Sequence, residues 1–311
     1  MRNGAKYTKI SKWFLIILFI FSPTLLIDAQ DIAEPPRAMW VWDVKIPASK
    51  ESTRRLLEFC KTRNINRLYI SAHHFSEQNI QNYRLFNRLA HSHDISVHAL
   101  GGDPRWGLER YHQQPLRWFE AILSFNRAVK PRERFDGIQN DTEVYLLGKP
   151  WEQNKGKLLK EYLDLNRKII ELRQIEEADI IYACDIPFWY DDDPSLVVIW
   201  DGQAKSPSFH ILDTVDSVTI MDYRNFADGP NGSIALAKNE IEYADSVNKK
   251  IYIGQETKEN LYPEHITFAK MTEQEMESEI RKLVKAYGSN PAFAGIAMHH
   301  YLSYRKLVEK K

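Results

Sequence analysis

One short segment shows how the whole chain is organised: Phe135-Asp136-Gly137-Ile138-Gln139-Asn140-Asp141-Thr142-Glu143. Its short apolar start and its alternation of side chains predict a β-strand. Amphipathic segments with helical spacing lie on both sides of it, at residues 115–129 and 155–177. Because a strand between two helices is the repeating unit of a parallel sheet, the segment predicts a domain in which strands and helices alternate.

The same alternation continues along the chain. Eight runs predict strands, at residues 38–43, 67–72, 96–102, 135–143, 180–187, 217–223, 250–257 and 293–301. Between them, six segments predict helices, at residues 52–64, 77–93, 115–129, 155–177, 234–247 and 272–287, whereas residues 189–214 predict an elaborated loop without a clean helix. Eight such units in roughly 260 residues fit one α/β domain, the (β/α)8 TIM barrel. A doubly wound open sheet is the alternative, but its glycine-rich phosphate loop is missing after the first strand, in Trp40-Val41-Trp42-Asp43-Val44-Lys45.

Charge and composition narrow the class of ligand. The 311 residues carry 42 Lys and Arg against 42 Asp and Glu, so the formal net charge is zero. This balance excludes the broad basic field of a nucleic-acid-binding protein. Aromatic residues make up 12% of the chain and include 8 Trp, more than a core readily buries with their polar atoms satisfied. The composition therefore indicates an enzyme or a binder of uncharged ligands, and we expect a monomer without a cofactor.

The first 29 residues have the pattern of a secretory signal peptide. Four basic residues and no acidic residue precede the apolar run at residues 13–21, and Pro23 follows that run. The run is short for a membrane span of about 20 residues, so a cleaved signal is favoured over an uncleaved anchor. We therefore expect residues 30–311 to form a barrel that is secreted or periplasmic, with no membrane span after cleavage. The two cysteines, Cys60 and Cys184, form no disulfide framework.

Within the segment 135–143, Gln139, Asp141 and Glu143 alternate, so a strand points all three to the same side. In a barrel, the carboxyl ends of the strands form the active-site face. Two carboxylates that are two residues apart repel each other, which raises the proton affinity of at least one of them. Glycoside cleavage needs a carboxyl group that stays protonated near neutral pH as its general acid. The alternative is a solvated strand end or a salt-bridged pair.

On these residues the sequence resembles glycoside hydrolase family 18, the chitinases and endo-β-N-acetylglucosaminidases. The fourth-strand signature of that family is D-G-x-D-x-D-x-E. Asp136, Gly137, Asp141 and Glu143 match it, and Gln139 stands in place of the middle aspartate. Three further strands agree in order: Ala99-Leu100-Gly101-Gly102 is similar to S-x-G-G, Met221-Asp222-Tyr223-Arg224 to M-x-Y-[DN], and Gly295-Ile296-Ala297-Met298 to the start of the eighth strand.

The resemblance implies a substrate-assisted, retaining hydrolysis of a glycan that contains N-acetylglucosamine. Glu143 would protonate the leaving glycosidic oxygen and later activate water. Asp141 would orient the acetamide group of the substrate as it attacks the anomeric carbon, and the Tyr223 hydroxyl would bind the acetamide oxygen. The remaining motif positions are expected to bind substrate: Gln139, Asp136, Met221 and Arg224.

The floor beneath the cleaved sugar is a point of departure from the family. Its eighth-strand tryptophan aligns with His299, and Tyr301 is a candidate to replace it. Trp106 is a candidate for stacking on a sugar face, and His73 and His299 are candidates for hydrogen bonds to the sugar. Each of these histidines is followed by a second histidine, which leaves a zinc site as an alternative. Consecutive side chains on a strand point to opposite faces, however, and we expect no metal.

Two other functions stay open. In the first, Glu256 on the seventh predicted strand is the nucleophile of a covalent retaining mechanism, with Glu143 as acid and base, which requires the two carboxyls about 5–5.5 Å apart. Otherwise Glu256 pairs with Lys258 or another cation. In the second, the barrel is a catalytically inert, lectin-like glycan binder. The presence of Glu143, Asp141 and Tyr223 favours an enzyme, whereas Gln139 and the missing tryptophan favour the binder.

Overall fold

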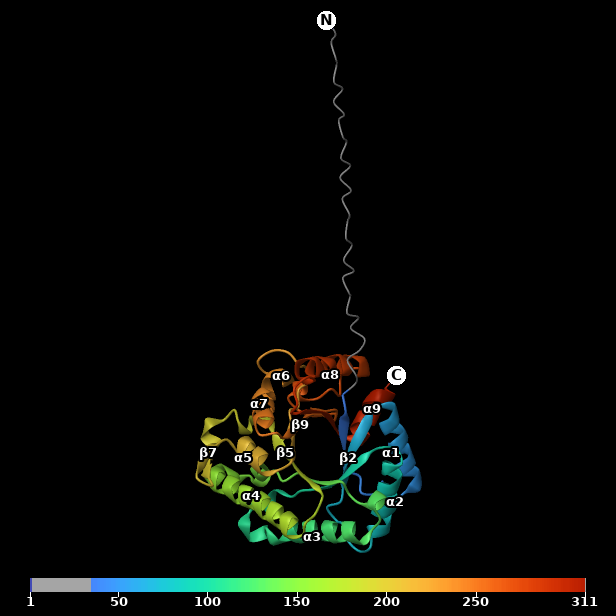
Figure 1. The fold of residues 1–311 in the computed structure, drawn as a ribbon, viewed down its shortest axis with the longest axis vertical. Coiled ribbons are helices and arrows are strands. Elements are labelled where there is room, and N and C mark those ends of the chain that lie inside the picture. The colour runs from blue at the N-terminus through green and yellow to red at the C-terminus, as the bar shows by residue number, and fades with distance from the viewer. Residues whose placement is uncertain (2–34, 311) are drawn as a thin grey trace. The chain divides into compact units, whose positions relative to one another are not determined.

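The strands of the protein form a closed ring with helices around its outside (Figure 1). The computed structural model describes Met1 and residues 35–310. All neighbouring strands of the ring are parallel, and β10 pairs with β1 to close it. Around the ring the strands are β1 (Arg37–Val41), β10 (Phe293–His299), β9 (Lys250–Glu256), β8 (Ser217–Met221), β5 (Ile181–Pro187), β4 (Gly137–Asn140), β3 (Ser96–Gly101) and β2 (Ile65–Ser71). The predicted (β/α)8 barrel is confirmed, and each predicted strand overlaps one strand of the ring.

Helices carry the chain from each strand to the next. They are α1 (Lys50–Thr62), α2 (Ile80–His91), α3 (Gln113–Ala128), α4 (Lys149–Ile175), α5 (Pro207–Thr214), α6 (Ser233–Leu236), α7 (Lys238–Ser246), α8 (Glu273–Tyr287) and α9 (Tyr301–Glu309). Helix α8 shows how the local sequence sets a helix start. The Thr272 hydroxyl accepts the Glu275 N–H at 3.2 Å, and the Glu275 carboxylate accepts the Thr272 N–H at 2.8 Å. This reciprocal capping satisfies two backbone donors that the helix leaves free.

The structure corrects the sequence-based boundaries in several places. The fourth strand was expected at residues 135–143, but β4 covers only Gly137–Asn140, so Asp141 and Glu143 follow the strand. Helix α9 was not among the six predicted helices. Residues 189–214 were expected to lack a helix, but they contain α5 and a hairpin of β6 (Val198–Trp200) and β7 (Gln203–Lys205). Helix α5 has only eight residues, which is too short for a clear hydrophobic period. The last strand was expected to reach Tyr301, but it ends at His299, and Tyr301 is the first residue of α9.

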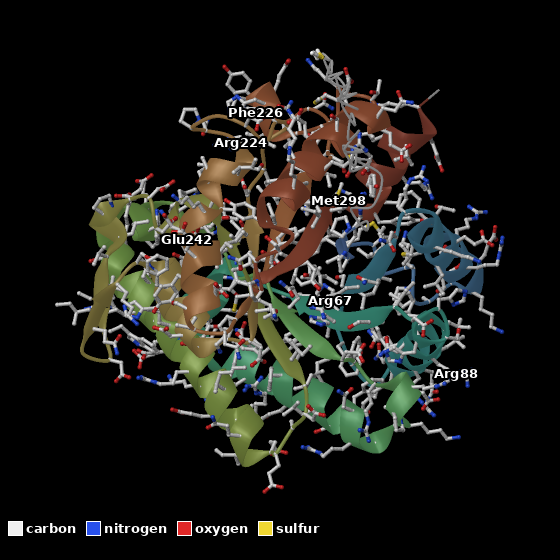
Figure 2. All side chains as sticks on the ribbon, turned by 45° about the horizontal axis from the view of Figure 1, so that its top comes forward. Arg67, Arg88, Arg224, Phe226, Glu242 and Met298 are labelled. Carbon is white, nitrogen blue, oxygen red and sulfur yellow. The ribbon has the colours of Figure 1, made fainter. Side chains whose placement is uncertain are left out.

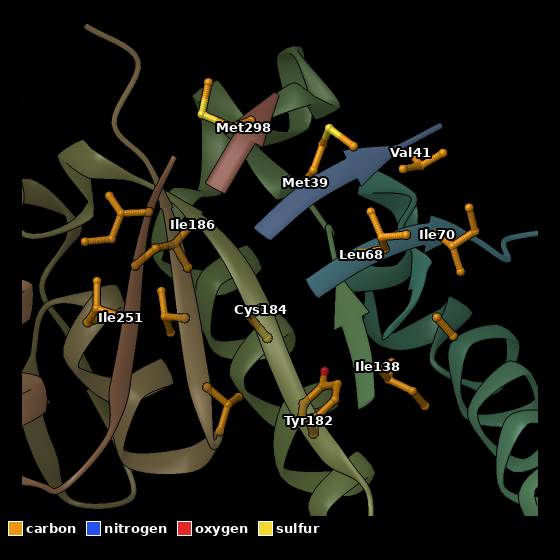
Figure 3. Packing of buried hydrophobic residues seen from close by; sticks show 14 of the residues in the cluster. Met39, Val41, Leu68, Ile70, Ile138, Tyr182, Cys184, Ile186, Ile251 and Met298 are labelled. Atoms are coloured by element: carbon orange, nitrogen blue, oxygen red, sulfur yellow. The ribbon is translucent and has the colours of Figure 1, made fainter. Parts of the chain in front are cut away.

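Side chains alternate along each strand between the surrounding helices and the interior of the barrel. The outward set is mainly aliphatic and packs on the helices, as Met39, Val41, Leu68 and Ile70 do in Figure 3. The inward set forms a separate small cluster: Ala38, Trp40, Tyr69, Leu100, Tyr252 and Ala297. Figure 2 shows Arg67 near the middle of the ring and Arg88 on helix α2, outside the ring. Because side chains fill the interior of an eight-stranded barrel, a site has room only at the ends of the strands.

The predicted signal peptide at residues 1–29 lies outside the described residues apart from Met1, and it stays a prediction. Within residues 35–310, the helices are too short or too polar to cross a bilayer. Cys60 and Cys184 are both buried and unbridged.

Candidate active site

The backbone at the carboxyl end of β4 is fixed against β3. The Asp141 N–H donates to the Gly101 carbonyl oxygen at 2.9 Å. Gly102 approaches the same residue so closely that a Cβ atom on it would lie 2.0 Å from the Asp141 carbonyl oxygen. Only a residue without a side chain permits this approach. Gly101, which ends β3, and Gly102, which follows it, therefore determine where Asp141 lies.

Three carboxyl groups at this end of the barrel perturb one another. Asp141 and Glu143 follow β4, and Asp185 lies on the neighbouring strand β5. Burial raises the pKa of Asp141 well above its ordinary value, and the charges of Asp185 and Glu143 raise it further. Burial also raises the pKa of Glu143, and it raises the pKa of Asp185 to about 7. Carboxyl groups that keep a proton near neutral pH are suited to general acid catalysis.

The carboxylate of Glu143 has its own hydrogen-bond donor. Tyr145 follows it in a short 3₁₀ turn, and the Tyr145 hydroxyl donates to Glu143 Oε2. This bond offsets part of the rise in the pKa of Glu143. The Tyr145 ring packs edge-on against Trp189, with ring centroids 5.1 Å apart. The loop after β5 thus supports the residue that positions Glu143.

A layer of hydrogen-bonded polar side chains crosses the barrel interior; it contains Asp185 and lies beneath Asp141 and Glu143. Gln139 Nε2 donates to Asp185 Oδ1 at 2.6 Å and lies 3.2 Å from Thr219 Oγ1. Trp40 Nε1 donates to the other oxygen, Asp185 Oδ2, at 3.1 Å. The hydroxyls of Thr219 and Tyr69 are 3.1 Å apart. All five side chains are buried, and both oxygens of Asp185 have a donor, as a buried carboxylate requires.

Tyr223 follows β8 and reaches the same carboxyl groups from across the barrel. Its pKa is raised well above the ordinary value by burial and then by four carboxylates, those of Glu256, Asp141, Asp185 and Glu143. A phenol that keeps its proton is a hydrogen-bond donor at any working pH. The structure therefore brings Tyr223 together with Asp141 and Glu143.

His299 ends β10 at the place where the tryptophan was missing. Its Nδ1 lies 2.7 Å from Glu256 Oε2, and Trp42 Nε1 donates to its Nε2 at 3.1 Å. Since an indole N–H can only donate, Nε2 must accept, and the proton of the neutral ring lies on Nδ1 and points to Glu256. The His299 ring also faces Tyr223, with ring centroids 5.7 Å apart. His299 thus occupies the mouth of the barrel in a fixed orientation.

Glu256 has both carboxylate oxygens engaged. Besides His299 at Oε2, the backbone N–H groups of Thr257 and Lys258 donate to Oε1 at 2.8 and 2.7 Å. The residue is 3% exposed. A carboxylate that is buried and fully hydrogen-bonded is a poor nucleophile toward a bound sugar, and it is well suited to hold the imidazole of His299.

Three residues that were expected at the site lie elsewhere. Asp136 precedes β4, so it lies at the opposite end of the strand from Glu143, and it accepts the Val97 N–H at 2.6 Å and His91 Nε2 at 2.9 Å. The Asp136 side chain is therefore a link between strand and helix and not part of the barrel mouth. Tyr301 is buried on α9 with its ring against Phe59, so it does not form the floor of a sugar site.

Arg224 is the third of these residues. It is 7% exposed, and its guanidinium lies 4.6 Å from the centroid of the Phe188 ring and donates to the Tyr223 carbonyl oxygen at 2.8 Å. Its Nη2 also donates to Asn231 Oδ1 at 3.0 Å. Figure 2 shows it beside Phe226 on the segment that follows β8. Arg224 therefore ties the loops after β5 and β8 together, with its charge directed into the loop.

The remaining expected residues surround the mouth with different exposure. Met221 ends β8 opposite Pro187 of β5. His73 follows β2 and stacks on Trp106, with ring centroids 5.2 Å apart and 15° between the planes. Trp106 is 5% exposed and is not open to a sugar, whereas the stacked His73 is half-buried. The two histidine pairs of the zinc alternative are not on neighbouring strands, because β1 lies between β2, which precedes His73, and β10, which ends at His299. Within residues 35–310 there is no cluster of three or more His, Cys, Asp or Glu that could hold a metal ion.

Four residues at the site were missed by the sequence analysis: Asp185, Trp40, Trp42 and Tyr145. Asp185 had a visible signal, because a carboxylate interrupts the otherwise apolar strand Ile181–Pro187. Trp40 points inward to Asp185, and Trp42 is 37% exposed beside His299. No pattern in the sequence indicated the contact of Tyr145 with Glu143.

Comparison with known proteins supports the fold. No protein-family model and no curated protein matches the chain. Among solved structures, a chitinase from Bacteroides thetaiotaomicron is 12% identical with a TM-score of 0.54, over 87% of this chain and 91% of that one. A family 18 chitinase from Pseudoalteromonas aurantia is 10% identical with a TM-score of 0.51, over 85% and 93%. A family 18 N-acetylglucosaminidase from Paenibacillus barengoltzii is 14% identical with a TM-score of 0.51, over 88% and 97%. The chain therefore has a divergent barrel of the kind found in family 18 enzymes.

Proposed function

We propose that the protein is a glycoside hydrolase that acts on a glycan containing N-acetylglucosamine. The observation that carries the proposal is the grouping of Asp141, Glu143 and Tyr223 at one end of the barrel, with raised pKa values on both carboxyl groups. The fold shared with family 18 enzymes adds support, because the three residues stand at the motif positions of that family.

In the proposed reaction, the substrate supplies the nucleophile. Protonated Glu143 donates its proton to the glycosidic oxygen as the bond to the anomeric carbon breaks. The carbonyl oxygen of the substrate acetamide attacks that carbon, and a cyclic oxazolinium ion forms. Asp141 accepts a hydrogen bond from the acetamide N–H, which orients the group and stabilises its developing positive charge, while the Tyr223 hydroxyl donates to the acetamide oxygen. Glu143, now ionised, takes a proton from a water molecule as the water oxygen attacks the anomeric carbon. The oxazolinium ring then opens, and the anomeric configuration is retained overall.

The geometry favours this route over a covalent glycosyl-enzyme. The covalent mechanism needs Glu256 as a free nucleophile, but both oxygens of Glu256 already accept hydrogen bonds. We assign Glu256 to holding His299 in place. We further propose that the protein works as a monomer outside the cytoplasm, in line with the signal peptide predicted at residues 1–29.

The direct test is hydrolysis of fluorogenic N-acetylglucosamine oligomers and of N-glycans by the wild type and by Glu143→Gln. Loss of a general acid lowers the rate by about 10²–10⁴-fold, and we expect kcat to fall by at least 100-fold. Glu242→Gln on α7 is the matched control, because it makes the same chemical change at a side chain that is 63% exposed, and it should keep the wild-type rate. Equal rates for the wild type and Glu143→Gln would refute the assignment.

Two further measurements separate the mechanisms. A thiazoline analogue, which mimics the cyclic intermediate, should inhibit the wild type. If it fails to inhibit while Glu256→Ala abolishes turnover, the covalent mechanism is correct and the substrate-assisted one is wrong. Glycan binding without turnover of any oligomer or N-glycan would identify a lectin-like protein instead.

A further inference from the structure

Asp185 is a carboxylate in the interior of the barrel whose partners are neutral. It is 2% exposed on β5. Trp40 from β1 and Gln139 from β4 each donate one hydrogen bond to it, and Thr219 from β8 lies on the same layer. Within residues 35–310, no Lys, Arg or His forms an ion pair with it. A buried carboxylate held only by neutral donors keeps much of its field, because no cation cancels it.

The titratable groups that interact with Asp185 are two carboxyls, two phenols and the thiol of Cys184, which burial keeps neutral. Asp141 and Glu143 lie toward the mouth of the barrel, and Tyr69 and Tyr223 lie on β2 and after β8. Both phenols stay neutral, since burial raises their pKa values far above the working range. The field of Asp185 therefore acts on Asp141 and Glu143.

The charge of Asp185 has its largest effect on the ionisation of Asp141. The Oδ1 atom of Asp141 is fully buried and has no hydrogen-bond partner among residues 35–310. An ionised carboxylate in such a position is unfavourable, whereas a protonated one needs no cation. The nearby negative charge of Asp185 disfavours ionisation of Asp141 in the same direction. The unpartnered, buried Oδ1 and the neighbouring charge of Asp185 therefore both favour the protonated form of Asp141.

We propose that Asp185 is a positioning residue of the reaction: its charge, held in the barrel interior by Trp40 and Gln139, keeps Asp141 protonated in the resting site and thereby sets the pH range in which Asp141 and Glu143 work together. This inference rests on the proposed function. In this inference, Asp185 on β5 influences the ionisation of Asp141 and Glu143 through its charge and does not contact the substrate.

The test is the pH dependence of kcat/KM in Asp185→Asn. Removal of a neighbouring negative charge lowers the proton affinity of the remaining carboxyls. The basic limb of the profile, where kcat/KM falls as the pH rises, should therefore move to lower pH by about one unit. Trp40→Phe removes a donor from the Asp185 carboxylate, which raises its pKa and reduces its charge near neutral pH, so a smaller shift in the same direction is expected. Asp245→Asn, at an exposed carboxylate on α7, should leave the limb unchanged.

An exchange of groups distinguishes this role from a structural one. Gln139→Glu combined with Asp185→Asn keeps the size of both side chains and reverses the hydrogen bond between them, so the carboxylate is retained one strand away. The double variant should return the basic limb toward its wild-type position. A structural role for Asp185 predicts lower stability in the single variant and no shift of the limb.

The proposed function and this inference can fail separately. If the wild type hydrolyses no substrate, the proposed function fails, and the inference is judged by ¹³C NMR titration of the aspartate carboxyls. In that titration, Asp141 should ionise at lower pH in Asp185→Asn than in the wild type. If the titration of Asp141 and the basic limb both stay unchanged in Asp185→Asn and in Trp40→Phe, the inference is wrong.

Discussion

Replacement of Gly102 by alanine should disable the site through the backbone alone. A Cβ atom at this position would lie 2.0 Å from the Asp141 carbonyl oxygen and 2.3 Å from its carbonyl carbon. Because Cβ atoms essentially never approach other atoms within 3.0 Å, one backbone must move by about 1 Å. The Asp141 N–H is bonded to Gly101, so the movement cannot spare the strand end that carries Asp141 and Glu143.

A displacement of about 1 Å at reacting groups costs about 100-fold in rate, or roughly 2.7 kcal/mol of transition-state stabilisation. We expect kcat/KM of Gly102→Ala toward the fluorogenic oligomer to fall by about that factor. Overpacking should also lower the free energy of unfolding by about 1–3 kcal/mol, measured by urea denaturation. The activity assay is run at a temperature at which the variant is folded, so that the two effects are separated.

Gly156→Ala is the matched control for this prediction. Gly156 lies in α4, and the nearest atom to a Cβ there is Val198 Cγ1 at 3.8 Å, an ordinary contact. The variant should keep the wild-type kcat/KM, and it should gain up to about 1 kcal/mol of stability, because alanine favours a helix over glycine. A folded Gly102→Ala protein with wild-type kcat/KM would refute the reasoning, since the predicted contact would then not constrain Asp141.

Two further changes test the charges at opposite ends of the barrel. Tyr145→Phe removes the hydroxyl that donates to Glu143; the pKa of Glu143 should rise, and the basic limb of kcat/KM should move to higher pH, opposite to the effect of Asp185→Asn. An unchanged limb would contradict this role for Tyr145. Glu277→Gln removes the carboxylate that accepts two hydrogen bonds, at 2.7 and 2.6 Å, from the buried Arg37. The free energy of unfolding should fall by about 3 kcal/mol in urea denaturation, and a loss below about 1 kcal/mol would show that water or other groups replace the pair.

The barrel could be predicted because each strand has a clear local pattern. A strand that is covered on both faces must be apolar on its outer side, and Met39, Val41, Leu68 and Ile70 satisfy this condition in two neighbouring strands. The register of side chains could be predicted for the same reason. Alternation places Gln139 with Asp141 and Glu143, and the structure keeps Gln139 on the inner side.

The partners of these side chains could not be predicted, because contacts across a barrel join residues far apart in the chain. The bond from Trp40 to Asp185 spans 145 positions, and the contact of Trp42 with His299 spans 257. Neither pair has a local signature. Tyr301 was misplaced for a different reason: a strand and a helix that meet without a loop leave no turn residues to mark the boundary between His299 and α9.

The layer of Trp40, Gln139 and Asp185 has an evolutionary consequence. Two donors meet two acceptor oxygens with no solvent nearby, so a change in any one residue leaves a buried polar atom without its partner. Substitutions that preserve folding must then occur jointly. Among related chains, the residues at positions 40, 139 and 185 should vary together. A carboxylate at position 139 on β4 should be accompanied by a neutral residue at position 185 on β5. This correlation would identify the lineage in which the charge moved from one strand to the other.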